Sequence, residues 1–238
     1  MSRSKPMPYS IFKLSHHITV IELEDYLKEY EEFVSSKISA IEIKYNEIHE
    51  LKKNQKEDAE YLDFLHDNLI DENMKFGSIF TNNFRSSFMS LVIMHLEHEL
   101  NKICSFHQKR NSIPFGVKDL KGNSDLDKVN IYLTQTEHLP ITSLKSWSKI
   151  KDYQFVRNKF AHQKGEIALS STSDVNKIKE ICKNYKGIKI EEKHKKIQIN
   201  LISPELCTES LNDIFAFLGE IISLLDNKSN TQTSSPSI

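Results

Sequence analysis

The first third of the chain carries apolar residues at helical spacing. Neither glycine nor proline occurs between Thr19 and Lys75. Apolar side chains recur there in steps of three and four at Leu23, Leu27, Tyr30, Val34, Ile38, Ile41, Tyr45, Ile48 and Leu51. This near-heptad spacing predicts one face of a long amphipathic helix, or of two helices with a break near Asn54, where the pattern weakens. We expect the stripe to serve packing or dimerisation.

Further helices are predicted after residue 75. Gly77 is expected to end the first helical run, and residues 111–124 read as a loop because they contain two glycines and a proline. The apolar residues of the next helix surround much of its circumference, which favours a central position. The predicted helices span residues 82–109, 125–136, 143–162 and 203–226, and Gly165 is expected to end the third of them. Another helix is expected to start within the loop at residues 170–174 and to run to Tyr185.

Alternating isoleucines and polar residues near the C-terminus predict a small β-hairpin at residues 187–201. The patterns together indicate a mainly α protein with this hairpin as an insertion near the C-terminus. They divide the chain into a long N-terminal helical segment (1–75), a helical domain (76–228) and a tail expected to be disordered (229–238).

Composition narrows the class of protein. The 238 residues are 38% hydrophobic and 27% charged, which is typical of a globular protein. The net charge of -1 provides no global field for nucleic acid, so such contacts require a local basic patch. The three cysteines share no short spacing, and we expect no disulfide framework, metal or other cofactor. Without an apolar leader or membrane span, a cytoplasmic protein with no membrane partner is expected.

Residues 145–164 form such a local basic patch. They contain six basic residues and a single acid, Asp152. Within this segment, the guanidinium of Arg157 can hold phosphate oxygens, and the imidazole of His162 can exchange protons with ribose oxygens. On an ideal helix these residues are rotated by ~140° and lie ~7.5 Å apart along the axis. We expect them to converge only if the helix loosens before Gly165, or if two chains each contribute a copy.

The stretch RNKFAH from Arg157 to His162 resembles the R-x4–6-H motif of the HEPN superfamily, in the form with Asn after Arg and a small residue before His. The preceding residues 147–156 (W-x-x-I-x-D-Y-x-x-V) look typical of the family as well, and the segment from Phe84 resembles its earlier core helix, which often carries an acid near the active site. The resemblance covers about residues 80–165. Lys164 stands where one subgroup has a tyrosine that becomes nucleotidylated, so that control is not expected.

The resemblance implies a HEPN-like helical bundle with metal-independent endoribonuclease activity, usually in a toxin or an antiviral-defence effector. It also implies a homodimer whose two motifs share a cleft, with RNA as substrate and an antitoxin or defence-system protein as a possible partner. Arg157 would bind phosphate, His162 would act as acid and base, and Asn158 would orient the motif or contact phosphate. Glu97, or else Glu99, would be the upstream acid. Substrate-binding roles are expected for Lys151, Lys159 and Lys164.

Two other functions stay open. The first is a non-catalytic helical module that binds RNA, nucleotide or a partner protein, in which the motif keeps its structure but does not catalyse a reaction. The second is an adaptor protein whose function depends on a coiled coil formed by residues 20–70.

Four further histidines occur as two close pairs. His95 and His98, three residues apart beside Glu99, suggest a metal site, but no second ligand pair has matching spacing. His16 and His17 are expected in solvent.

Overall fold

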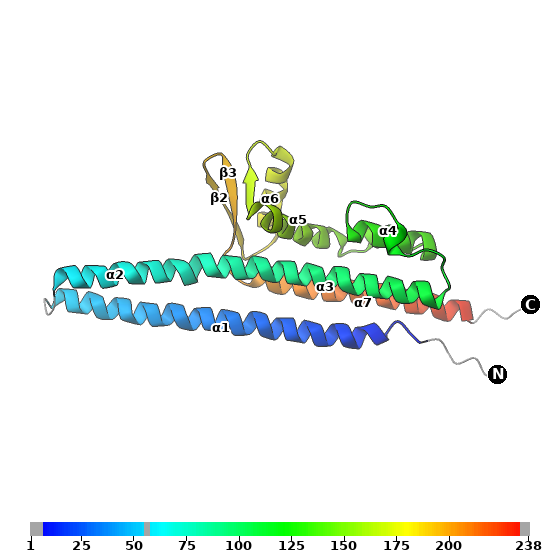
Figure 1. The fold of residues 1–238 in the computed structure, drawn as a ribbon, viewed down its shortest axis with the longest axis horizontal. Helices are drawn as coiled ribbons and strands as arrows, with labels where there is room; N and C mark the ends of the chain where they lie inside the picture. Colours follow the sequence, from blue (N-terminus) through cyan, green and yellow to red (C-terminus); the bar gives the residue numbers. More distant parts are fainter. Residues whose placement is uncertain (1–6, 55–57, 234–238) are drawn as a thin grey trace, which may run out of the picture. The chain divides into compact units, whose positions relative to one another are not determined.

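The computed structural model describes residues 7–54 and 58–233, with side chains up to residue 229. It is mainly helical with a small antiparallel sheet, as the sequence predicts (Figure 1). The elements are α1 (Ile11–Lys53), α2 (Ala59–Met74), the π-helix η1 (Lys75–Ile79), α3 (Phe80–Arg110), the 3-10 helix η2 (Val117–Asp119), α4 (Asp125–Glu137), the 3-10 helix η3 (Ile141–Ser143), α5 (Trp147–Gln163), β1 (Glu166–Ala168), α6 (Thr172–Asn184), β2 (Ile188–Lys193), β3 (Lys196–Leu201) and α7 (Glu205–Thr233).

The described residues fall into two compact units. The first unit comprises the described parts of residues 1–23, 89–158 and 208–238, and the second comprises those of 24–88 and 159–207. This division differs from the one expected at residue 75, because α1, α3, α5 and α7 each contribute to both units. In the expected tail, α7 continues to Thr233, and residues 234–238 lie outside the described part of the chain.

The core of the first unit includes apolar faces from α3, α4, α5 and α7, together with Val20 and Leu23 of α1. The buried side chains of α3 include Met89, Val92, Ile93, Leu96 and Leu100, which lie within about 100° of one another on a single face of the helix. Leu91 and Met94 on the opposite side are exposed, so α3 is not surrounded as its predicted central position requires. On the other helices, the buried side chains include Leu126, Val129 and Leu133 of α4, Ile150, Tyr153 and Val156 of α5, and Ile214, Phe217, Leu218 and Ile221 of α7. The Tyr153 hydroxyl donates to Asp213 Oδ2 of α7 at 2.5 Å, which fixes α5 against this core.

The second unit contains a helical hairpin made of α1 from residue 24 onward and α2. Figure 1 shows α2 running back beside α1, and the predicted break near Asn54 is confirmed. The Asp58 side chain caps α2 by accepting from the Glu60 amide at 2.9 Å. Ile41, Ile48, Leu62 and Leu69 form the hairpin core, so part of the predicted stripe is used for packing within the chain.

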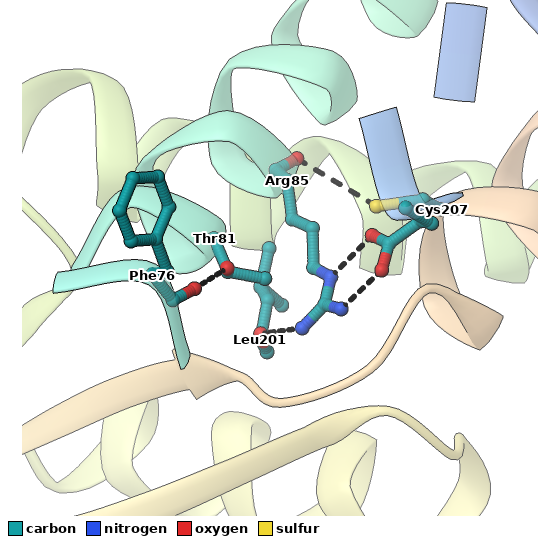
Figure 2. Close-up of polar contacts among 6 residues, drawn as sticks. Phe76, Thr81, Arg85, Leu201 and Cys207 are labelled. Atoms are coloured by element: carbon teal, nitrogen blue, oxygen red, sulfur yellow. Dashed lines mark hydrogen bonds and ion pairs between the residues drawn. The ribbon is translucent and has the colours of Figure 1, made fainter. Parts of the chain in front are cut away.

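Gly77 does not break the helical run, so that prediction is wrong. Residues 75–79 continue from α2 into α3 as a π-helix. The Thr81 hydroxyl donates to the carbonyl of Phe76, as Figure 2 shows, and this contact occupies a carbonyl in the widened turn. A single glycine costs a helix only about 1 kcal/mol relative to alanine, which packing on both sides can offset.

Arg85 of α3 connects three elements of the second unit (Figure 2). Its Nε and Nη2 donate to the two carboxylate oxygens of Glu31 on α1 at 2.8 and 2.6 Å, and its Nη1 donates to the Leu201 carbonyl of β3 at 2.9 Å. The Cys207 thiol donates to the Arg85 carbonyl at 3.6 Å. Every nitrogen of this guanidinium that can donate therefore has a protein acceptor.

The sheet has the strand order β1-β3-β2, and both pairings are antiparallel. The predicted hairpin is confirmed as β2 and β3, in register at Ile190 opposite Ile199. The three-residue strand β1, which pairs Ile167 with Ile197, is too short for a period-two pattern and was not predicted. Ile167, Ile197 and Ile199 are buried, as are Val175, Ile178 and Ile181 of α6.

Candidate active site

Helix α5 carries the complete motif and ends directly after it. The helix extends to Gln163, Lys164 follows in the left-handed region at φ 53°, and Gly165 has φ 78°. The Gly165 amide donates to the Lys159 carbonyl at 3.0 Å and closes the helix end. A Cβ at Gly165 would lie 2.7 Å from the Phe160 ring, so this position requires glycine. The prediction that Gly165 ends this helix is confirmed.

The helix stays regular between Arg157 and His162. The expected offset of ~140° and ~7.5 Å along the axis therefore persists, and no loosening before Gly165 brings the two side chains together. His162 is exposed, and no hydrogen bond or ion pair to it occurs among the described residues. Asn158 is half-buried and its side chain likewise has no hydrogen bond within the described part of the chain.

Arg157 contacts Glu97 of α3, and both residues belong to the first unit. Arg157 Nη2 donates to Glu97 Oε1 at 3.0 Å, with 18% and 20% of the two side chains exposed. The Nε of Arg157 is buried and has no hydrogen-bond partner among the described residues. The guanidinium thus keeps donors that the protein does not use, at a partly open position.

Glu97 is poised to hold a proton more readily than an ordinary carboxylic acid. Burial raises its pKa, the charge of Asp125 raises it further, and the opposing effect of Arg157 is smaller than that of burial. A carboxyl group with a raised pKa beside a guanidinium is a common feature of catalytic sites. Glu99 lies elsewhere, since it pairs with Lys102 at 2.7 Å and is 4% exposed. Of the two candidate acids, Glu97 is therefore the one that contacts Arg157.

The three lysines expected to bind substrate differ in how far they are occupied. Lys151 donates to Gln154 Oε1 at 2.8 Å. Lys159 donates to Asp174 Oδ2 at 2.6 Å, and this contact is the main reason why the pKa of Asp174 is lowered. Lys164 is exposed and makes no side-chain hydrogen bond or ion pair among the described residues. Only Lys164 has an ammonium group that is fully available to a ligand.

The positive charge of the segment is smaller than its composition suggests. Lys149 contacts Asp213 at 3.0 Å and Glu209 at 3.3 Å, and Lys159 is neutralised by Asp174 as described above. These acids come from α6 and α7, outside residues 145–164, so a count along the segment could not include them. Arg157 is itself paired with Glu97, which leaves Lys145, Lys151 and Lys164 as the cations of the segment for which no ion pair occurs among the described residues.

Two of the histidines outside the motif, the buried His16 and the partly buried His95, form a pair. His16 is 2% exposed, so the expectation that it is solvated is wrong, because its ring packs between His95 and Phe215. His16 Nδ1 lies 2.7 Å from His95 Nε2. Burial, with a contribution from His95, lowers the pKa of His16 to about 4. Among the described residues, no group of three or more His, Cys, Asp and Glu side chains is arranged to hold a metal ion.

No protein-family model, curated protein or solved structure matches this chain. Within the described residues, no helix combines the length and the apolar character needed to span a bilayer.

Proposed function

We propose that this protein is a metal-independent endoribonuclease of HEPN type that acts as a homodimer. The contact between Arg157 and Glu97 is the observation that supports the proposal. It joins the two segments that resemble the family, the motif helix α5 and the earlier helix α3, through the residues expected to bind phosphate and to supply the upstream acid. In this proposal the bundle of the first unit is a HEPN-like domain, and the protein is a cytoplasmic toxin or antiviral-defence effector controlled by a partner protein.

In the proposed reaction, Arg157 binds the phosphate that is attacked by the neighbouring 2′-oxygen. Its unused donors suit two phosphate oxygens, and its charge stabilises the extra negative charge of the transition state. An imidazole accepts the 2′-hydroxyl proton or donates one to the leaving 5′-oxygen, which yields a 2′,3′-cyclic phosphate and a free 5′-hydroxyl. Glu97 holds Arg157 in place and can take up a proton when phosphate displaces it. Asn158 and Lys164 flank the bound RNA.

The imidazole of this site is proposed to come from His162 of a second copy. Within one chain, the regular helix α5 keeps His162 and Arg157 apart, so the imidazole does not act on a phosphate held by Arg157 of the same chain. In a two-fold dimer each motif can face the other, so that Arg157 of one copy meets His162 of its partner. A shared cleft of this kind needs no distortion of α5.

The activity assay follows cleavage of a single-stranded RNA by the purified protein in EDTA. We expect cleavage with 2′,3′-cyclic phosphate ends, and a loss of at least about 100-fold in kcat for Arg157→Ala and for His162→Ala. His49→Ala and Arg110→Ala are matched controls that should retain activity, since both residues lie outside α5. Cleavage that survives both motif substitutions, or that is abolished by EDTA, contradicts the proposal.

A mixing experiment tests the shared cleft directly. Arg157→Ala and His162→Ala chains are inactive alone, but a mixed dimer contains one site with both residues intact. Random mixing should restore about a quarter of the wild-type activity, because half of the dimers are mixed and each has one working site of two. If mixing restores nothing while both chains form dimers, each site is built within one chain.

One observation favours a second function, a non-catalytic helical module that binds RNA or nucleotide. Arg157 is held by Glu97, and His162 on the same regular helix lies well away along the axis. A binding module would show RNA affinity that falls in Arg157→Ala, with no product in the wild type over long incubation. Measuring binding and cleavage on the same RNA separates the two functions.

A further inference from the structure

The helical hairpin of the second unit exposes many large apolar side chains. Its buried core is small and centres on Ile41, Ile48, Leu62 and Leu69. The exposed large side chains between residues 41 and 74, each at least 41% accessible, are Ile43, Tyr45, Tyr61, Phe64, Ile70 and Met74. Single exposed apolar residues are ordinary, but a cluster on a two-helix element marks a surface that a partner can cover.

Part of this apolar surface is hollowed into a groove between α1 and α2. The groove has a volume of about 370 Å³ and is lined by Ile41, Glu42, Tyr45, Asn46, Leu69, Ile70 and Asn73. A second hollow of about 660 Å³ shares Asn46 and is lined also by Ile43, Glu47, Glu50, Leu51 and Asn54. Together they follow α1 from Ile41 to Asn54, which corresponds to ~20 Å, or about four helical turns.

The charge around this groove has one sign. Its lining contains Glu42, Glu47 and Glu50 and no basic residue, although Lys53 pairs with Glu50 at 2.8 Å. The described residues of the whole hairpin, 24–54 and 58–74, carry fourteen acidic side chains and five lysines. Helix α2 contains no lysine or arginine at all. A partner that covers the groove must therefore combine apolar side chains with positive charge.

We propose that this groove binds a basic amphipathic helix of about 14 residues from a partner protein. Its apolar face covers Tyr45 and Ile70, and its lysines or arginines face Glu42 and Glu47, in the manner of other helix-in-groove complexes. A second copy of this chain is a poor occupant, because two strongly acidic hairpins would repel each other. The site lies in the second unit and does not depend on Arg157, so it goes beyond the proposed ribonuclease activity.

The binding test uses the full chain and a fluorescent synthetic peptide. The probe is a 14-residue helix with leucine at helical spacing and lysine elsewhere, and the controls are a scrambled peptide of the same composition and a leucine–glutamate peptide. We expect the amphipathic lysine peptide to bind at least about tenfold more tightly than either control, measured by fluorescence anisotropy. Equal binding of the scrambled peptide would show a mere charge effect and overturn the proposal.

Groove variants locate the site on the hairpin. Ile70→Ser and Tyr45→Ser should each weaken binding of the lysine peptide by about tenfold. Phe64→Ser should not, because Phe64 is more exposed than either residue but lies outside the groove lining. These side chains are exposed, and circular dichroism confirms that each variant folds. If Ile70→Ser leaves peptide binding unchanged, the groove is not the site. If sedimentation instead shows that Ile70→Ser dissociates a wild-type dimer, the groove joins two copies, which also overturns the proposal.

A cleavage assay distinguishes a failure of the groove proposal from a failure of the ribonuclease proposal. Ile70→Ser should cleave RNA like the wild type, because the groove is not part of the proposed active site. Loss of cleavage in Ile70→Ser, with the fold intact, contradicts the independence of the two sites.

Discussion

Arg85 in the second unit and Arg157 in the first unit each contact a glutamate, yet they use the guanidinium differently. Arg85 is 7% exposed, forms two parallel hydrogen bonds to Glu31 and donates a third to the Leu201 carbonyl. Arg157 is 18% exposed, has one contact with Glu97 at 3.0 Å and keeps a buried Nε without a partner among the described residues. All three nitrogens of Arg85 therefore contact protein acceptors, whereas Arg157 makes a single contact through one nitrogen.

This difference separates an arginine that holds the fold from one that can hold a ligand. A buried guanidinium whose three nitrogens all contact the protein cannot turn its fork toward a phosphate without giving up those contacts. An arginine that makes a single protein contact at a partly exposed position can offer its other donors to a phosphate while that contact stays in place. Substitution of Arg85 should therefore mainly lower the free energy of unfolding, and substitution of Arg157 should mainly lower RNA cleavage.

The largest effect is expected for Arg85→Ala. It leaves the Glu31 carboxylate and the Leu201 carbonyl without their partner in a largely buried place, which costs about 3–5 kcal/mol of the free energy of unfolding. Arg157→Ala removes one contact at a more accessible position and should cost about 1 kcal/mol or less. Urea denaturation followed by circular dichroism measures both values. Equal losses of unfolding free energy in the two variants would show that Arg157 stabilises the fold as much as Arg85 does.

Much of the fold was predictable because local patterns determine it. The break near Asn54, the end of α5 at Gly165 and the β2–β3 hairpin follow from spacing, glycine and alternation in adjacent residues. The π-helical continuation past Gly77 was not predictable, since it depends on packing around Phe76 and Thr81. Arg85 raised no signal in the sequence because Glu31 and Leu201 are distant along the chain.

The candidate site was predictable only in part for the same reason. The motif in α5 is contiguous, so its residues could be named from the sequence. The choice of Glu97 over Glu99 required the direction of each side chain on α3, and the neutralisation of Lys149 and Lys159 required acids from α6 and α7. Charge counted along a segment overestimates the field wherever partners arrive from elsewhere in the fold.

His107 and His16 are both buried but differ in their hydrogen-bond partners, and this difference can be tested by varying the pH. His107 contacts the Tyr132 hydroxyl at 3.0 Å and Glu137 at 2.6 Å, whereas the buried His16 contacts the ring of His95 at 2.7 Å and has no carboxylate within hydrogen-bond distance among the described residues. The pKa of His16 falls from 6.5 to about 4, so between these values the unfolded chain binds more protons than the folded protein. The free energy of unfolding should therefore fall by about 3 kcal/mol as the pH is lowered through this window.

Comparing His16→Phe with His17→Phe isolates this effect in denaturation experiments between pH 7 and pH 4. His16→Phe should lose most of the pH dependence, because the ring no longer titrates in the unfolded chain. His17 is exposed, so His17→Phe should keep the dependence of the wild type. An unchanged slope in His16→Phe would assign the acid sensitivity to other groups.

Arg157→Lys sharpens the comparison without removing charge. Lysine keeps the positive charge but lacks the fork that binds two phosphate oxygens, so RNA cleavage should fall by about 100-fold. The free energy of unfolding should change by less than about 1 kcal/mol. Arg85→Lys is the matched control and should show the reverse, with lower stability and normal cleavage by the folded fraction. Full activity in Arg157→Lys would mean that charge alone suffices at this position.

The smallest expected effect concerns how Glu97 competes with RNA for Arg157. Because burial raises the pKa of Glu97, acidification protonates it earlier than an ordinary glutamate, and protonation weakens its hold on the guanidinium. In a His162→Ala background, which prevents cleavage, RNA affinity should therefore rise by about fivefold, roughly 1 kcal/mol, as the pH falls toward 5. Adding Glu97→Gln should give the high affinity at every pH and abolish this rise. If the rise persists with glutamine at position 97, another group controls access to Arg157, and the ion pair is only a structural contact.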